Sequence, residues 1–263
     1  MNDHCYHTTE LRFSEGVLDS AVNMAYLLTM VDSNREWQKE LYNFPLSSKV
    51  TVVYNMGFRN CKKQLVKQIS YCDLQDAVLY IFNDALRKGY QRILVLEDDF
   101  QILEKKKEHY YSVEDFIKKK NPDVYNLGPM ITLCGKPSIL THNASWFFTT
   151  THAVIYNQNY ITYFVQKAPH RAGHVDTYFN KASVKKYTYY MPLIGQTFPM
   201  TENRQSWPMS ISYLSDMWIS VWRLDTSCQN YKYQQWFLTW VTWLVGVSLL
   251  IYSCKKIILL FHK

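Results

Sequence analysis

Residues 93–100 read Ile-Leu-Val-Leu-Glu-Asp-Asp-Phe, a short apolar run that ends in three adjacent acids. An unbroken apolar run of this length, bounded by charged residues, is typical of a strand buried on both faces of a sheet. We therefore predict a buried strand over Ile93–Leu96. In an open α/β sheet, ligands bind outside the carboxyl ends of the strands, so Glu97, Asp98 and Asp99 should face a crevice.

Predicted strands and helices alternate on both sides of this strand. β-branched and aromatic runs indicate strands, and apolar residues at helical spacing indicate helices. This order is typical of βαβ units and predicts an α/β fold with a mainly parallel sheet flanked by helices. The predicted strands are Ala25–Met30, Val50–Tyr54 and Trp146–Tyr156, and the predicted helices are Arg35–Tyr42, Leu74–Leu86 with Asp73 as N-cap, and Val113–Lys120.

Composition excludes several classes of protein. The chain has 263 residues, of which 48% are hydrophobic and 19% charged, so it is neither a disordered chain nor a charged coiled coil. Its formal net charge is +7, but Lys255, Lys256 and Lys263 follow the last acid of the chain. Elsewhere the basic residues are scattered apart from Lys105–Lys107 and Lys118–Lys120, so we expect no nucleic-acid partner.

The six cysteines show no recognisable metal-site spacing. They contain no CxxC pair, and no Cys–His spacing matches a zinc site. We expect free thiols in a reducing compartment. Residues 1–7 are polar and no apolar segment follows them, so no signal peptide is predicted.

The C-terminal region is the clearest change in composition. Residues 236–252 read WFLTWVTWLVGVSLLIY and carry no charge. This length is at the lower edge of a membrane span, which takes about 20 residues, and the alternative is a buried core helix. We predict a transmembrane helix over 236–252 with a short tail over 253–263. The chain would then be a single-pass C-terminal membrane protein with a cytosolic catalytic domain, although the lysines that follow the span favour a cytoplasmic C-terminus instead.

The three acids suit a hard divalent cation. Mg²⁺ and Mn²⁺ bind carboxylate oxygens together with substrate phosphates. Alternate residues of an extended segment share a side, so Glu97 and Asp99 can approach one metal ion. The alternative is a solvated acidic turn, but three adjacent carboxylates repel one another unless a cation compensates them.

An ordered series of motifs resembles glycosyltransferase family 25, which includes lipooligosaccharide and collagen galactosyltransferases. The segment Ile93–Phe100 is similar to the acidic metal motif of that family. Stretches of the chain also resemble glycosyltransferase-like proteins of large DNA viruses. The other matching segments, in chain order, are Tyr26–Arg35, His152–Tyr156 (HAVIY), His174–Tyr178 (HVDTY), Pro192–Gln196 (PLIGQ) and Thr201–Trp207.

The resemblance implies a GT-A-like domain over residues 25–210, after an N-terminal extension over 1–24 and before a connector over 211–235. It implies divalent-metal-dependent transfer of a sugar from a nucleotide-sugar donor to a hydroxyl of a glycan or glycoprotein acceptor. The cofactor would be Mn²⁺ or Mg²⁺, and the reaction would invert the anomeric centre. The implied residues are Glu97, Asp99 and His174 for the metal; Thr29, Met30, Val31, Arg35, Asp73 and Asp98 for the donor; and His152 and Gln196 on the acceptor side.

An inverting reaction needs a carboxylate that deprotonates the acceptor hydroxyl, and Asp176 is the candidate for this base. Asp176 could instead cap a helix that begins at Thr177, and His174 could be an ordinary exposed histidine. The chain departs from the bacterial family at Gln68–Asp76, which lacks the usual glycines and Ser-His.

This departure leaves open a catalytically inactive relative that acts as a carbohydrate-binding or membrane structural protein. A second alternative is a different metal-dependent nucleotide enzyme, such as a nucleotidyltransferase. The three acids alone support that hypothesis. The chain has no GxxxxGK[ST] phosphate loop, which argues against kinases and ATPases of that class.

Overall fold

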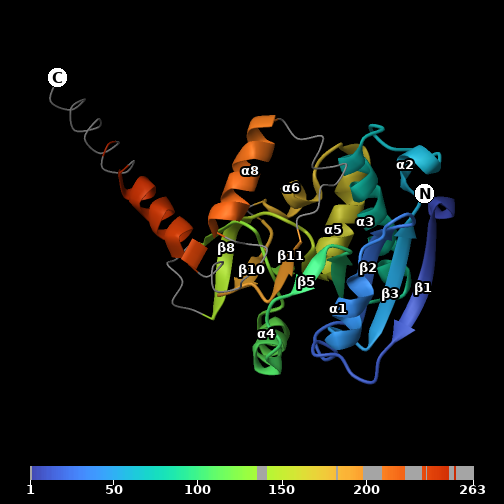
Figure 1. Cartoon of the computed structure of the whole chain (residues 1–263), viewed down its shortest axis with the longest axis horizontal. Coiled ribbons are helices and arrows are strands. Elements are labelled where there is room, and N and C mark those ends of the chain that lie inside the picture. The colour runs from blue at the N-terminus through green and yellow to red at the C-terminus, as the bar shows by residue number, and fades with distance from the viewer. Residues whose placement is uncertain are drawn as a thin grey trace.

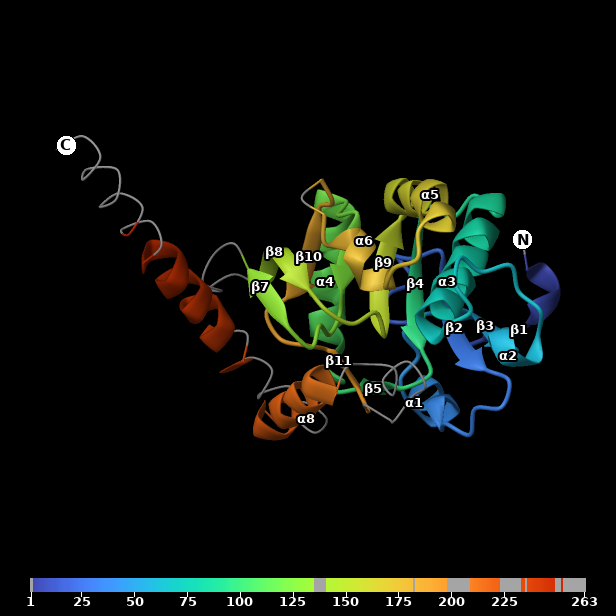
Figure 2. The ribbon, with the colours of Figure 1, turned by 90° about the horizontal axis from the view of Figure 1, so that it is seen from above.

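The computed structural model describes residues 2–134, 141–181, 183–197, 209–222, 233–234, 236–248 and 252. The predicted motif at 201–207 and the tail at 253–263 lie outside these residues. Strands and helices alternate through most of the described chain, and they form a large sheet between two layers of helices (Figure 1 and Figure 2).

Within the described residues, the main sheet has nine strands in the order β1-β3-β2-β4-β9-β6-β10-β8-β7. A separate two-stranded sheet joins β5 (Phe100–Ile102) to β11 (Ile194–Gln196). The strands of the main sheet are β1 (Tyr6–Arg12), β2 (Met24–Met30), β3 (Lys49–Asn55), β4 (Arg92–Glu97), β6 (Val124–Asn126), β7 (Thr132–Cys134), β8 (His142–Phe148), β9 (Ala153–Asn157) and β10 (Lys186–Tyr189).

The expectation of a mainly parallel sheet was wrong, because the sheet is mixed. The pairs β2–β3, β2–β4 and β6–β10 are parallel. The remaining pairs, including β4–β9 and β6–β9, are antiparallel. The strand β9 inserts between β4 and β6, so the parallel arrangement predicted from βαβ units holds only for β2, β3 and β4.

Two groups of helices cover the two faces of the sheet. One face packs against α3, α5 and α6, and the other packs against α1 and α4 (Figure 2). The helices are α1 (Trp37–Asn43), α2 (Gly57–Asn60), α3 (Ser70–Arg87), α4 (Lys107–Lys120), α5 (Gln158–Lys167), α6 (Val175–Phe179) and α8 (Met209–Trp222), with 3-10 turns η1 (Asp3–Cys5) and η2 (Ala168–His170).

The predicted strand at 93–96 is confirmed as the centre of the fold. Leu94 and Leu96 enter the core beneath α1 and α4, whereas Ile93 and Val95 enter the core beneath α3 and α5. All four are 3% exposed or less. Burying side chains of this kind contributes about 1.5–3 kcal/mol each, so β4 is held firmly from both faces and its acidic end is fixed in place.

The predicted helix over 74–86 is also confirmed, within the longer α3. Gly89 has φ +69° just after the helix, the left-handed conformation that glycine adopts readily at a helix end. Asp73 is not its N-cap, because the helix begins at Ser70 after Ile69 and Asp73 lies in the first turn.

Two elements differ from the predicted ones. The strand predicted over 146–156 is two strands, β8 and β9, and Thr150 between them has φ +72°. A β-branched residue in this conformation cannot continue a strand. At the N-terminus, β1 pairs antiparallel with β3, although its sequence HTTEL has little apolar character. An edge strand that is exposed to solvent needs few apolar side chains.

The expectation that all the cysteines are free thiols was wrong. Cys5 and Cys61 form a disulfide with a Cα–Cα distance of 5.7 Å. Their sequence separation is 56, so no local spacing pattern could reveal the pairing. Cys72 is buried and free, and its burial raises the pKa of the thiol.

The prediction of a C-terminal transmembrane helix was wrong. Residues 236–248 are helical, but none of the helices in the described part of the chain is long and apolar enough to cross a membrane, which takes about 20 residues. The single-pass anchor, the membrane as a partner and the localisation inferred from them are therefore withdrawn.

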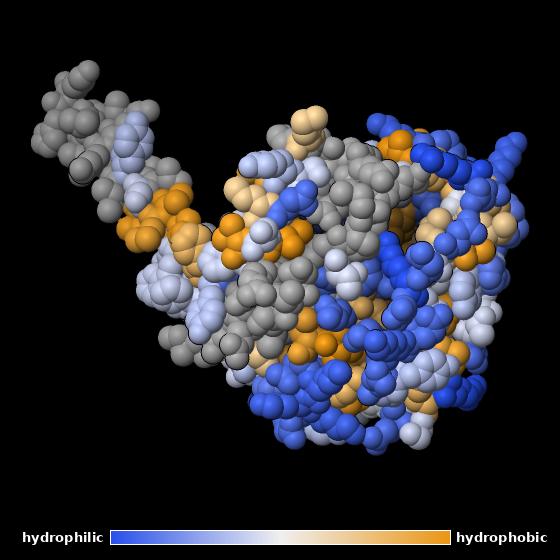
Figure 3. All heavy atoms as spheres, viewed as in Figure 1, coloured by the Kyte–Doolittle hydropathy of each residue, from blue (hydrophilic) through white to orange (hydrophobic). Residues whose placement is uncertain are grey.

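This segment instead begins against the body of the protein. Gln234 is buried and donates a hydrogen bond to the Met130 carbonyl at 2.7 Å, and the rings of Phe237 and Trp222 lie 5.5 Å apart. Apolar side chains farther along the helix and on α8 are exposed (Figure 3).

Candidate functional site

The candidate site lies where β4 ends. The Asp98 amide donates to the Leu28 carbonyl of β2 at 3.1 Å, and the Glu97 amide donates to the His152 carbonyl at 2.9 Å. These bonds continue the sheet past the apolar run and hold the acidic segment between its two neighbours. The three predicted acids therefore lie at the carboxyl edge of the parallel strands, where open α/β sheets bind ligands.

Asp98 organises the loop that follows β2. Its carboxylate accepts hydrogen bonds from Thr29 Oγ1 and Ser33 Oγ, both at 2.7 Å, and it forms an ion pair with Arg35. Charge-assisted hydrogen bonds such as these are among the strongest in proteins. The structure thus brings together two predicted donor residues, Thr29 and Arg35, and adds Ser33, which the sequence analysis missed.

Arg35 spans two of the acids. Its guanidinium also lies 3.8 Å from Asp99 Oδ2, and its side chain is 28% exposed. Met30 and Val31, which precede it in the same loop, are each 43% exposed. The loop therefore presents one cation and two apolar side chains to solvent beside the acids.

Asp99 is buried and only partly satisfied. Gln196 Nε2 donates to Asp99 Oδ2 at 2.7 Å, whereas Asp99 Oδ1 is buried and has no hydrogen-bond partner among the described residues. Burial raises the pKa of Asp99. Gln196, predicted on the acceptor side, reaches Asp99 because β11 pairs with β5 directly after the acids.

The pKa of Glu97 is raised far above its usual range. Thr151 donates its hydroxyl to the Glu97 carboxylate. Burial, followed by the negative charge of Asp99, raises the pKa of Glu97 to about 8. Two carboxylates that oppose each other's ionisation in this way are typical of a site that binds a cation or moves a proton.

The acids would supply part of the ligand set of a divalent metal ion, and a bound substrate would supply the rest. Asp99 Oδ1 is a buried oxygen without a partner, and a cation there would remove the repulsion between Glu97 and Asp99. Within the described residues, however, these acids do not gather with a third His, Cys, Asp or Glu close enough to share an ion. Mg²⁺ and Mn²⁺ bind in such settings through one or two carboxylates plus substrate phosphates.

His174 and Asp176 lie at the start of α6. His174 is the N-cap residue, is exposed, and has its ring 4.6 Å from the ring of Tyr71. Asp176 lies in the first turn, so it is not the cap, and burial raises the pKa of its carboxyl. Burial, followed by the charges of Glu97 and Asp176, raises the pKa of Tyr156.

His152 belongs to the core. It is fully buried, its Nε2 lies 3.2 Å from the Ile194 carbonyl, and burial lowers its pKa to about 4, so the ring is neutral. Its Nδ1 has no partner. Gly128 is required beside it, because a Cβ there would come within 1.6 Å of the Ile194 carbonyl oxygen. His152 thus packs against the strand that carries Gln196.

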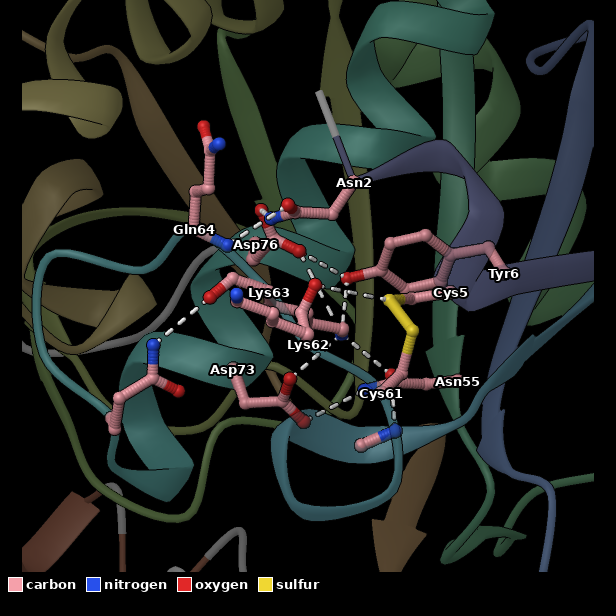
Figure 4. Close-up of a disulfide and its surroundings, with 12 residues drawn as sticks. Asn2, Cys5, Tyr6, Asn55, Cys61, Lys62, Lys63, Gln64, Asp73 and Asp76 are labelled. Carbon is pink, nitrogen blue, oxygen red and sulfur yellow. Dashed lines mark hydrogen bonds and ion pairs between the residues drawn. A yellow bond between two sulfur atoms is a disulfide. The ribbon is translucent and has the colours of Figure 1, made fainter.

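Asp73 was predicted to contact the donor, but its carboxylate already pairs with neighbouring side chains. It accepts hydrogen bonds from Asn55 Nδ2 at 2.9 Å and Lys63 Nζ at 2.7 Å (Figure 4). Lys63 also donates to Tyr6 and Asn55, and its side chain is inaccessible to solvent. We name Asn55, Lys63, Asp73, Asp76 and Tyr6 the Lys63 cluster.

Thr151 is the second site residue that the sequence analysis missed. It lies in the run Thr149-Thr150-Thr151 between β8 and β9. These consecutive threonines interrupt a long aromatic stretch and indicate a break between two strands. The prediction of one strand over 146–156 overlooks this break.

Comparisons with known proteins add little to this geometry. No protein-family model matches the chain, and no curated protein matches it. Among solved structures, the chain is similar to the crystal structure of A197 from STIV, with 11% sequence identity over 68% of this chain and 86% of that chain. The TM-score is 0.41, and a likeness at this level does not bear on function.

Proposed function

We propose that the chain is a glycosyltransferase that moves a sugar from a nucleotide-sugar donor to a hydroxyl of a glycan or glycoprotein acceptor. The observation that carries this proposal is the buried, unpartnered Asp99 Oδ1 beside Glu97, at the carboxyl edge of the sheet. Buried polar atoms are normally hydrogen-bonded, so an orphan carboxylate oxygen beside two other acids favours a ligand. The motif series at Tyr26–Arg35, Ile93–Phe100 and His174–Tyr178 supplies the reaction class.

Glu97 and Asp99 would hold Mn²⁺ or Mg²⁺ together with the donor diphosphate. The metal, when bound, neutralises the negative charge that develops on the leaving diphosphate. Arg35 would help to neutralise the same negative charge, because its guanidinium is partly exposed beside Asp99 and can bind a phosphate oxygen. Asp98 keeps Arg35 and the loop after β2 in position, through its bonds to Thr29 and Ser33.

Asp176 would accept the proton of the acceptor hydroxyl. Burial raises the pKa of its carboxyl, which makes it a stronger base than an exposed carboxylate. Thr151 would orient the Glu97 carboxylate through its hydroxyl.

Binding of nucleoside diphosphates tests the proposal. The full chain is titrated with UDP and GDP, with and without Mn²⁺, and donor hydrolysis and sugar transfer are measured on a panel of sugar nucleotides. We expect metal-dependent binding by the wild type, weakened binding by Asp99→Asn, and unchanged binding by Asp115→Asn, which removes an exposed acid on α4.

Three results distinguish the alternatives. No nucleotide binding across the panel contradicts the proposal. Metal-dependent binding without transfer or donor hydrolysis indicates a catalytically inactive relative. Equal binding by Asp99→Asn and the wild type removes the metal assignment while leaving a nucleotide site.

A further inference from the structure

A second group of metal-ligating side chains lies at the N-terminal end of the fold. His4, Cys5 and Cys61 each offer one ligand atom, and these atoms all lie within 4.8 Å of one another. Cys5 ends η1, and Cys61 directly follows α2. In the structure the two sulfur atoms are joined as a disulfide (Figure 4). An imidazole and two thiolates are the ligands that thiophilic cations such as Zn²⁺ prefer.

Solvent reaches this group from one side. His4 is exposed and Cys61 is partly exposed, whereas Cys5 is fully buried. A reductant can therefore attack through the Cys61 sulfur, and a cation can enter on the His4 side. Zinc sites with three protein ligands typically take a water molecule as the fourth ligand, and His4, Cys5 and Cys61 would form such a three-ligand set.

Hydrogen bonds keep the two segments together independently of the disulfide. The Met56 amide donates to the Cys5 carbonyl at 3.1 Å, and Asn2 Oδ1 accepts from the Gln64 amide at 2.9 Å. Lys63 Nζ donates to the Tyr6 hydroxyl at 2.6 Å (Figure 4). These bonds flank both cysteines along the chain, so the two thiols of the reduced chain stay close to each other and to His4.

We propose that this group is a redox-controlled metal site, in which reduction of the Cys5–Cys61 disulfide creates a site for a thiophilic divalent cation held by His4, Cys5 and Cys61. The oxidised and metal-bound forms exclude each other, because a sulfur in a disulfide has no thiolate to give. With a thiol reductant, two thiols become one disulfide while Cys5 and Cys61 take up two electrons and two protons. Binding of the cation then releases both thiol protons.

Zinc binding by the oxidised and reduced full chain tests the proposal. A phosphine reduces the disulfide without competing as a thiol ligand; it becomes a phosphine oxide with oxygen from water, whose two hydrogens go to the cysteines. Cys72, Cys134, Cys228 and Cys254 are replaced by serine, and the wild type is measured in parallel. We expect one Zn²⁺ per reduced chain and none per oxidised chain.

A pair of histidine variants supplies the matched control. His4→Ala leaves the disulfide intact and should weaken zinc binding by at least the roughly 10–100-fold seen when a group that only hydrogen-bonds to a metal ligand is lost. His7→Ala removes another exposed histidine, three residues away on β1, and should leave zinc affinity unchanged.

Four results would overturn the proposal. They are no zinc binding by the reduced chain, equal binding by oxidised and reduced chains, equal affinities of His4→Ala and the wild type, and loss of the fold on reduction as measured by circular dichroism.

Discussion

The Lys63 cluster and the acidic end of β4 are both buried groups of charge, and they differ in how those charges are compensated. In the Lys63 cluster, the ammonium donates to Tyr6, Asn55 and Asp73, and Asp76 lies 3.6 Å away. At the end of β4, the Arg35 guanidinium pairs with Asp98 and Asp99 of the three acids, and one oxygen of Asp99 has no partner among the described residues.

This difference separates a structural cluster from a candidate binding site. A buried charge is tolerated when it is paired and hydrogen-bonded, and it then specifies one arrangement of the elements around it. A buried charge that lacks a partner keeps an energetic cost that a ligand can remove. The two groups should therefore respond in opposite ways when one charge is deleted.

The largest expected effect is on the Lys63 cluster. Lys63→Met leaves Asp73 buried without its cation and should lower the free energy of unfolding by about 3–5 kcal/mol. Urea denaturation measures this loss. Lys62→Met, a change at the exposed neighbouring lysine, should change stability by less than about 0.5 kcal/mol. If the two variants are equally stable, the Lys63 cluster does not hold these elements together.

The next effect concerns activity rather than stability. Asp99→Asn should lower the rate of sugar transfer at least about a hundredfold, because metal stabilisation of transition-state charge is worth several kcal/mol. The same change should leave stability equal or higher, since it removes a buried carboxylate with an unpaired oxygen. Transfer assays and urea denaturation on one preparation measure both quantities. If Asp99→Asn is less stable than the wild type, the acids at the end of β4 have a structural role like that of the Lys63 cluster.

A further effect is a pH dependence of stability. Because the pKa of Glu97 is about 8 in the folded chain and 4.5 without the fold, folding favours its protonated form. The contribution of Glu97 to stability is therefore complete below pH 4.5 and is lost as pH rises through about 8. Glu97→Gln should be more stable than the wild type at pH 9, and this difference should shrink toward pH 4.

Thermal unfolding of both chains between pH 4 and pH 9 measures this change. Glu108→Gln, a change at an exposed glutamate on α4, should follow the wild type at every pH. A constant difference between Glu97→Gln and the wild type would mean that Glu97 titrates normally.

Several parts of the fold could be predicted because their signals are local. The strand Ile93–Leu96 is recognisable by four consecutive apolar residues, and α3 by its apolar spacing and Gly89. The acidic end of β4 follows directly from that strand. The insertion of β9 between β4 and β6 could not be predicted, since an antiparallel partner from 60 residues away leaves no periodic signal in either strand.

The candidate site was likewise predictable only in part. Glu97, Asp98 and Asp99 are contiguous, so their shared position needs no long-range information. The partners that set their properties come from distant segments: Thr29 in β2, Arg35 after β2, Thr151 before β9, and Gln196 in β11. The predicted donor residue Asp73 illustrates the converse, because Lys63, ten residues away, already neutralises it.

By itself, the sequence determined that a buried strand ends in three acids, because apolar runs and adjacent carboxylates are properties of neighbouring residues. Only the tertiary structure decided which of those acids are compensated, since burial and hydrogen-bond partners depend on where distant segments meet. The same holds for the cysteines. Cys5 and Cys61 are unremarkable in the sequence, and the pairing of β1 with β3 brings them together with His4.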